Sequence, residues 1–142
     1  MNDELMKMVM NTAKTMASEG VMAPVMLLKI AGRSDMVCTN PDMSTPETKS
    51  NTVDLIKRMI SSGDLKEFVL VCEASRSESG DSEKMDCILI MRSSRSSETL
   101  YVCDIIRGEG TSFGEWSVCS DSSPLRQGAL NNLFDRVLCS SN

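Results

Sequence analysis

Histidine is missing from this sequence of 142 residues, and its absence excludes several classes of enzyme at once. Ser-His-Asp and Cys-His nucleophile systems need an imidazole as general base. Zinc sites with imidazole ligands and histidine proton shuttles are excluded for the same reason. Any enzyme chemistry must therefore use carboxylates, lysine, Tyr101, hydroxyl groups or thiols.

Long apolar runs and paired-cysteine motifs are lacking as well. No apolar run approaches the roughly 20 residues that cross a bilayer. The first four residues, Met-Asn-Asp-Glu, are acidic and open no signal peptide. We therefore expect a cytoplasmic protein with no membrane partner. No Cys-x-x-Cys pair occurs among the six cysteines, so reduced, buried thiols are the predicted state.

Aromatic residues are scarce, with one Trp, one Tyr and three Phe, whereas methionine occurs 12 times. Methionine fills irregular gaps in protein cores, and most of these methionines lie at apolar positions of periodic segments. The hydrophobic share of 41% and the charged share of 25% are ordinary for a globular chain. The composition therefore predicts one domain over residues 1–142.

Apolar periodicity and turn residues predict an α+β fold. The expected elements are a helix over 3–19, a strand hairpin over 25–31 and 36–39, a helix over 45–63, strands over 68–74, 85–91, 100–106 and 113–119, and a last helix from Ser123. Short polar links join the last four strands, which favours an antiparallel meander. The prediction is a largely antiparallel sheet, made of this meander and the N-terminal hairpin, packed with three helices.

Two helices carry clear start signals. Thr45 followed by Pro46 and Glu47 is a cap, a proline in the first turn and an early acid. Ser123 and Pro124 repeat the first two signals before the last helix. An apolar stripe on that helix predicts that Leu130, Leu133, Phe134 and Val137 are buried.

A short pattern around the first turn of the meander resembles uncharacterised bacterial and phage proteins. Residues 72–74 read Cys-Glu-Ala, and residues 83–86 read Glu-Lys-Met-Asp. The related pattern is Glu-Ala-Trp, followed by Pro-Asp-Arg-x-Glu, and here Ser75, Lys84 and Asp86 stand at the Trp, Arg and last Glu positions. The resemblance implies a bacterial or phage origin and no known activity. The order of elements is also similar to roadblock and profilin-like folds, which does not fix a function.

The predicted meander also gathers acidic residues. With turns centred between 79 and 80, on Arg95, and at 109–110, alternate side chains place four carboxylates on one sheet face. This acidic quartet consists of Glu73, Asp86, Asp104 and Glu115. The opposite face then carries Cys72, Cys87, Cys103 and Trp116, which we interpret as core residues beneath helices rather than as a thiolate site.

Facing carboxylates repel one another, and three arrangements relieve the repulsion. A hard cation, Mg²⁺ or Ca²⁺, can bind between them. One carboxyl group can keep a proton and act as a general acid. Alternatively, a register shift of one residue separates the four carboxylates, or all four face water. The sequence leaves these readings open.

Neither edge of the predicted meander carries a strong basic footprint with interleaved aromatics: one has Arg76, Lys84 and Arg107 among four acids, the other has Arg92 and Arg95 with Glu98, and the net charge is −5. A phosphate-binding surface needs unopposed lysine and arginine, so no nucleic-acid partner is expected. The leading hypothesis is a small, non-enzymatic protein-interaction domain that self-associates and has no cofactor. The alternative is a domain or enzyme that binds a divalent metal through the acidic quartet.

Overall fold

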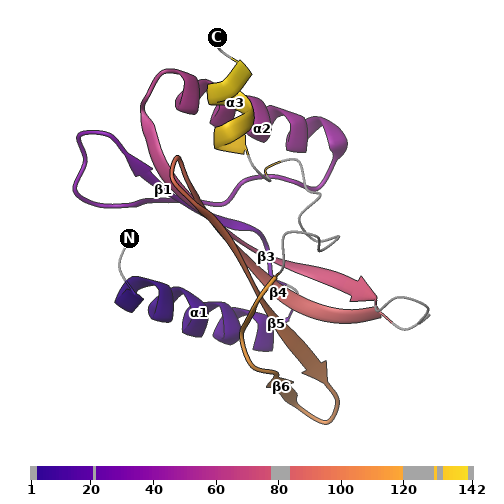
Figure 1. The fold of residues 1–142 in the computed structure, drawn as a ribbon. Coiled ribbons are helices and arrows are strands. Elements are labelled where there is room, and N and C mark those ends of the chain that lie inside the picture. Colours follow the sequence, from indigo (N-terminus) through magenta and orange to yellow (C-terminus); the bar gives the residue numbers. More distant parts are fainter. Residues whose placement is uncertain (1–2, 21, 78–83, 120–129, 131–132, 141–142) are drawn as a thin grey trace.

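The computed structural model describes residues 3–20, 22–77, 84–119, 130 and 133–140 (Figure 1). These residues form an α+β fold with three helices and seven strands. The elements are α1 (Asp3–Ser18), β1 (Val25–Ile30), β2 (Val37–Thr39), α2 (Pro46–Ser61), β3 (Leu65–Ser77), β4 (Lys84–Ser94), β5 (Glu98–Arg107), β6 (Thr111–Phe113), β7 (Ser117–Val118) and α3 (Leu133–Ser140). No helix among these residues is long and apolar enough to span a membrane.

All the strands belong to one antiparallel sheet with the order β2-β1-β3-β4-β5-β6, and β7 also pairs with β5. The predicted hairpin and meander are therefore joined through β1 and β3, whose pairing runs from Val25↔Val71 to Ile30↔Leu65. The long β3–β4 hairpin forms the centre of the sheet. Figure 1 shows α1 on one face, and α2 with α3 on the other.

Side chains alternate between the two faces along the central strands, so these strands contribute to a hydrophobic core on each face of the sheet. Val69, Val71 and Ile88 are buried beneath α1. Phe68 and Met91 point the other way and are buried beneath α2 and α3. The buried residues of α1 itself are Met6, Ala13 and Ala17, and Val9, Met10 and Met16 are partly buried against the same core.

The second core confirms the prediction for the last helix. Leu130, Leu133, Phe134 and Val137 are all buried. The ring of Phe134 stacks on Phe68 with a centroid distance of 5.8 Å, which fixes α3 to the sheet. The predicted helix start at Ser123 lies outside the residues that the structure describes.

The start of α2 also follows the prediction. Thr45 Oγ1 accepts a hydrogen bond from Thr48 N, and Thr48 Oγ1 accepts one from Thr45 N. This reciprocal capping box satisfies two backbone donors at the helix start. Gly63 ends the helix in a left-handed conformation, with φ of 81°, which costs glycine little.

All the strands differ somewhat from their predicted bounds, and the differences in two regions affect how the side chains are placed. β3 begins at Leu65 instead of Phe68, because a register shift between Lys29 and Ile30 lets both Leu65 and Phe68 face the α2 core. The predicted strand over 113–119 is interrupted after Phe113, and the chain resumes pairing only at Ser117. The break matters for the acidic quartet.

Candidate functional site

Glu73 and Asp86 share one face of the sheet, as the sequence predicted, although they are not directly opposite. Glu73 pairs with Ile88, and Asp86 pairs with Ser75. The true register is displaced by two residues from the predicted one, and an even displacement leaves every side chain on its predicted face. The two carboxylates are therefore diagonal neighbours.

Arg107 binds both of these carboxylates. Its Nη2 lies 3.0 Å from Glu73 Oε1, and its Nε lies 3.3 Å from Asp86 Oδ2. Its Nη1 also donates to the carbonyl oxygen of Ala17, at 3.4 Å, in the last turn of α1. The carbonyl end of a helix favours a cation. One guanidinium therefore joins three strands to α1 and relieves the repulsion for which a metal ion was one of the possible remedies.

Asp104 lies on the opposite face, so the predicted register between β4 and β5 is wrong by one residue. Asp104 pairs with Cys87, not with Asp86. The reason is the turn between the strands. Ser94 N donates to Ser97 O at 2.8 Å, which closes a tight turn centred between Arg95 and Ser96, half a residue beyond the predicted centre. This odd displacement reverses the face of every β5 side chain relative to β4.

Glu115 does not continue the carboxylate row, because it lies outside the strands. Gly114 N donates to the Asp104 carbonyl oxygen at 3.0 Å, and the chain leaves the ladder at this point. Glu115 lies in the irregular stretch between β6 and β7 and is exposed. Within the described part of the chain, no three Asp, Glu or Cys side chains gather closely enough to hold a metal ion.

The predicted cysteine face is divided by the same register change. Cys72 and Cys87 remain on one face, while Cys103 belongs to the core beneath α1, where Trp116 also packs. Cys103 Sγ donates to Gly114 O at 3.3 Å. Burial raises the pKa of Cys72 and of Cys103, which disfavours the thiolate and hence nucleophilic or metal-binding roles. The five cysteines whose side chains are described form no disulfide.

Comparison with known proteins identified no relative. No protein-family model, curated protein or solved structure matches the chain. Function therefore has to be inferred from the geometry of the molecule itself, and two further features are relevant.

The first feature is the projecting part of the β3–β4 hairpin, which we call the arm. It extends from the pair Cys72↔Leu89 to the pair Ser77↔Lys84. β1 covers the outer edge of β3 only as far as Val71, and no other described strand pairs with this edge beyond that residue. Six residues of β3, Cys72–Ser77, therefore present an open backbone edge. The sequence did not predict this edge, because the edge exists only where β3 extends beyond the end of β1 and no residue type marks that point.

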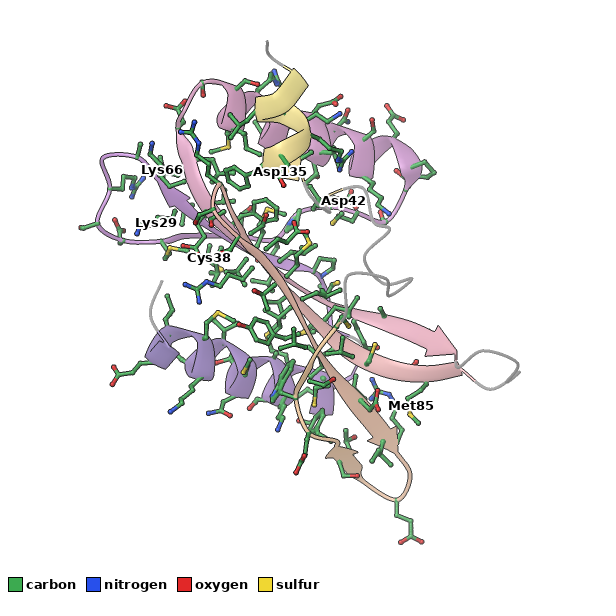
Figure 2. All side chains as sticks on the ribbon, in the orientation of Figure 1. Lys29, Cys38, Asp42, Lys66, Met85 and Asp135 are labelled. Atoms are coloured by element: carbon green, nitrogen blue, oxygen red, sulfur yellow. The ribbon has the colours of Figure 1, made fainter. Side chains whose placement is uncertain are left out.

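Two exposed apolar side chains lie at this end of the sheet, one on the arm and one on the neighbouring strand β5. Met85 on β4 is 45% exposed, and Ile106 on β5 is 50% exposed. The register Cys87↔Asp104 places both on the same face of the sheet. Figure 2 shows Met85 at the projecting end of the molecule, far from Lys66 at the other end of the hairpin.

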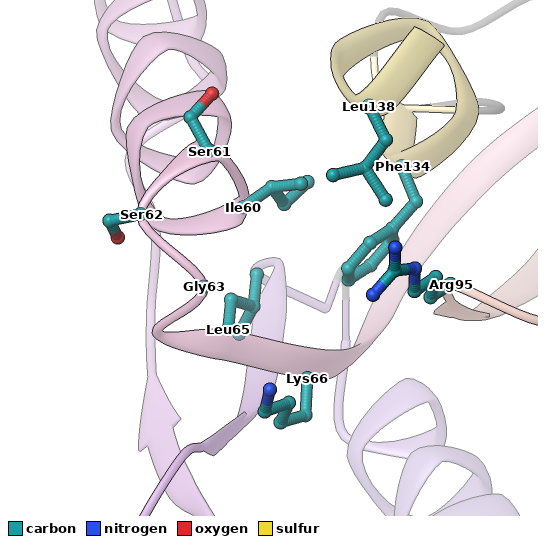
Figure 3. Close-up of a pocket in the computed structure, with 9 residues that line it drawn as sticks. All are labelled: Ile60, Ser61, Ser62, Gly63, Leu65, Lys66, Arg95, Phe134 and Leu138. Carbon is teal, nitrogen blue, oxygen red and sulfur yellow. The ribbon is translucent and has the colours of Figure 1, made fainter. Parts of the chain in front are cut away.

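The second feature is a cavity of about 210 Å³ at that other end. Its apolar walls include Ile60, Leu65, Phe134 and Leu138 (Figure 3). The polar part of the lining includes two cations, Lys66 and Arg95, together with residues 61–63 at the end of α2. The sequence did not predict this cavity, because its lining residues come from four separate places: α2, the start of β3, the β4–β5 turn and α3.

Proposed function

We propose that this protein is a small, non-enzymatic interaction domain that self-associates through the arm. The observation that carries the proposal is the open edge of β3 at Cys72–Ser77. An unpaired strand edge offers a row of backbone donors and acceptors to a second strand. Two identical edges can pair antiparallel about a two-fold axis, which gives a closed dimer.

The composition of the edge supports this use. Natural edge strands are commonly protected by proline, by lysine or by a bulge. The stretch Cys72–Ser77 contains neither proline nor lysine, its one basic residue is Arg76 near the projecting end, and its pairing with β4 runs without a bulge to the last residue. Its acidic residue, Glu73, is bound to Arg107 and is only 11% exposed, so its charge does little to repel a second strand.

The neighbouring apolar residues add contact area. Six paired residues alone bury less surface than the roughly 1,200 Å² of a stable interface. Met85 lies one strand in from this edge and Ile106 two strands in, on one face of the sheet, and we expect the partner's arm to cover part of that face. We expect a dimer whose population rises with protein concentration.

The test is the molar mass in solution, measured by size-exclusion chromatography with light scattering over a wide concentration range. The wild-type protein should shift from monomer to dimer as concentration rises. Ser75→Lys, which places a charge on the edge, and the double variant Met85→Lys/Ile106→Lys should both stay monomeric.

A matched control uses apolar residues of similar exposure elsewhere. Met8 on α1 is 63% exposed and Leu55 on α2 is 50% exposed. The double variant Met8→Lys/Leu55→Lys should dimerise like the wild type. A wild-type monomer at every concentration, or equal loss of the dimer in the control, would contradict the proposal.

A further inference from the structure

The cavity between α2, α3 and the β3–β4 hairpin combines an apolar wall with two cations that have no acidic partner among the residues that the structure describes. Ile60, Leu65 and Phe134 are buried and form the wall. Lys66 and Arg95 are exposed, and among the described residues no carboxylate lies within salt-bridge distance of either one. This arrangement is unusual in a chain with a net charge of −5.

The register of the hairpin brings the two cations together. Glu67 pairs with Ser94, so Lys66 and Arg95 are the next residues outward on the two neighbouring strands. Like charges at facing positions destabilise a sheet. The nearby acids are bound elsewhere: Glu67 accepts from Arg92 at 2.7 Å, and Asp64 accepts from Ser62 at 2.9 Å. A bound anion would relieve the repulsion between the two cations.

The size of the cavity limits the ligand. Its volume of about 210 Å³ is below the roughly 300–1,000 Å³ of pockets that hold drug-sized molecules or cofactors. There is room for one apolar side chain and not for a long acyl chain. The ligand must therefore carry its negative charge close to a single apolar group.

We propose that this cavity binds the C-terminal residue of a partner polypeptide. The apolar side chain of that residue lies against Phe134 and Leu138, and its α-carboxylate lies between Lys66 and Arg95. A C-terminal leucine or phenylalanine joins both groups in one residue. An internal aspartate or glutamate does not, because its charge is on the side chain itself.

The cavity is independent of the arm, because the two lie at opposite ends of the β3–β4 hairpin (Figure 2). Lys66→Gln/Arg95→Gln should therefore leave the molar mass in solution unchanged. Failure of one proposal is thus distinguishable from failure of the other.

The experiment measures fluorescence polarisation of a labelled peptide, Gly-Ser-Gly-Ser-Leu, with a free C-terminal carboxylate. We expect saturable binding to the full chain. Amidation of the peptide terminus, or replacement of its leucine by glycine, should weaken binding about tenfold. The double variant Lys66→Gln/Arg95→Gln should weaken binding of the free acid by the same factor, and added salt should weaken binding to the wild type.

The matched control is Lys7→Gln/Lys49→Gln, which removes the same charge from two exposed lysines that do not line the cavity. This control should bind the peptide like the wild type. Equal binding of the acid and amide peptides, or equal weakening by the control, would overturn the proposal. Competition by hexanoate at a concentration similar to that of the peptide would overturn the assignment to a polypeptide terminus.

Discussion

The guanidinium of Arg107 holds Glu73, which lies 34 positions earlier in the chain, through a hydrogen bond of 3.0 Å from Nη2 to Oε1. Because Glu73 is only 11% exposed, removing the cation leaves a largely buried carboxylate without its partner. We expect Arg107→Gln to lower the free energy of unfolding by about 1–3 kcal/mol. Urea denaturation followed by circular dichroism measures the change.

The control for this variant is Arg33→Gln. Arg33 lies 3.7 Å from Asp35, and both side chains are more than half exposed. An exposed pair of this kind contributes about 0–1 kcal/mol. If the two variants lose equal stability, Arg107 is a surface charge and not a structural link between α1 and the sheet.

Phe134 is expected to be the main anchor of α3. It is 3% exposed and stacks on Phe68, which is fully buried. Phe134→Ala should cost about 3–5 kcal/mol, a large share of a typical total stability of roughly 5–15 kcal/mol. Leu55→Ala, at an exposed position of α2, should change the urea midpoint little. A midpoint equal to wild type in Phe134→Ala would mean that α3 is not fixed by this contact.

Local signals in the sequence predicted most elements of the fold, although two short strands, β6 and β7, stand where one strand over 113–119 was expected. The cap at Thr45 fixed the start of α2, and the apolar stripe of the last helix identified its buried residues. These features depend on spacings within one helix, which the sequence records directly. Alternation along β3 and β4 likewise placed Glu73 and Asp86 correctly on one face.

The candidate site was less predictable, because it depends on how the elements meet. Moving the β4–β5 turn centre by half a residue sent Asp104 to the other face. The predicted strand over 100–106 stops one residue before Arg107, whose side chain reaches back to Ala17. The cations at the cavity, Lys66 and Arg95, become neighbours only through the register of the hairpin. The spacing of residues along the sequence does not predict such contacts between elements.

The cap of α2 gives a local test of stability. Thr45 and Thr48 satisfy each other's backbone N–H groups through their side chains. We expect Thr45→Ala to cost about 1 kcal/mol, because it leaves the N–H of Thr48 without this acceptor. Thr45→Asp should retain most of the stability, since aspartate is also a good cap. Equal loss in both variants would show that the hydrogen bond is not the cause.

The cysteines should differ in their reactivity toward a thiol reagent. The pKa of Cys72 and of Cys103 is raised because burial disfavours the thiolate, whereas Cys38 is exposed. At pH 8 we expect Cys38 to be alkylated first, and Cys72 and Cys103 only slowly. Because the thiolate is the reactive form, their labelling should rise as the pH approaches the raised pKa. Mass spectrometry of peptides after timed labelling measures the order, and early labelling of Cys103 would contradict it.

Divalent cations should leave the melting temperature of the wild-type protein unchanged. Of the acidic quartet, Glu73 and Asp86 already share Arg107, Asp104 lies across the sheet, and Glu115 is exposed. A cation bound at a hundredfold excess over its dissociation constant would add about 2.7 kcal/mol, which is easily detected. Thermal unfolding with Mg²⁺, Mn²⁺ or Ca²⁺ measures the effect. Arg107→Gln, which leaves two neighbouring carboxylates without their cation, should respond more than the wild type. A rise in the wild type that disappears in Asp86→Asn would instead establish a metal site at these carboxylates.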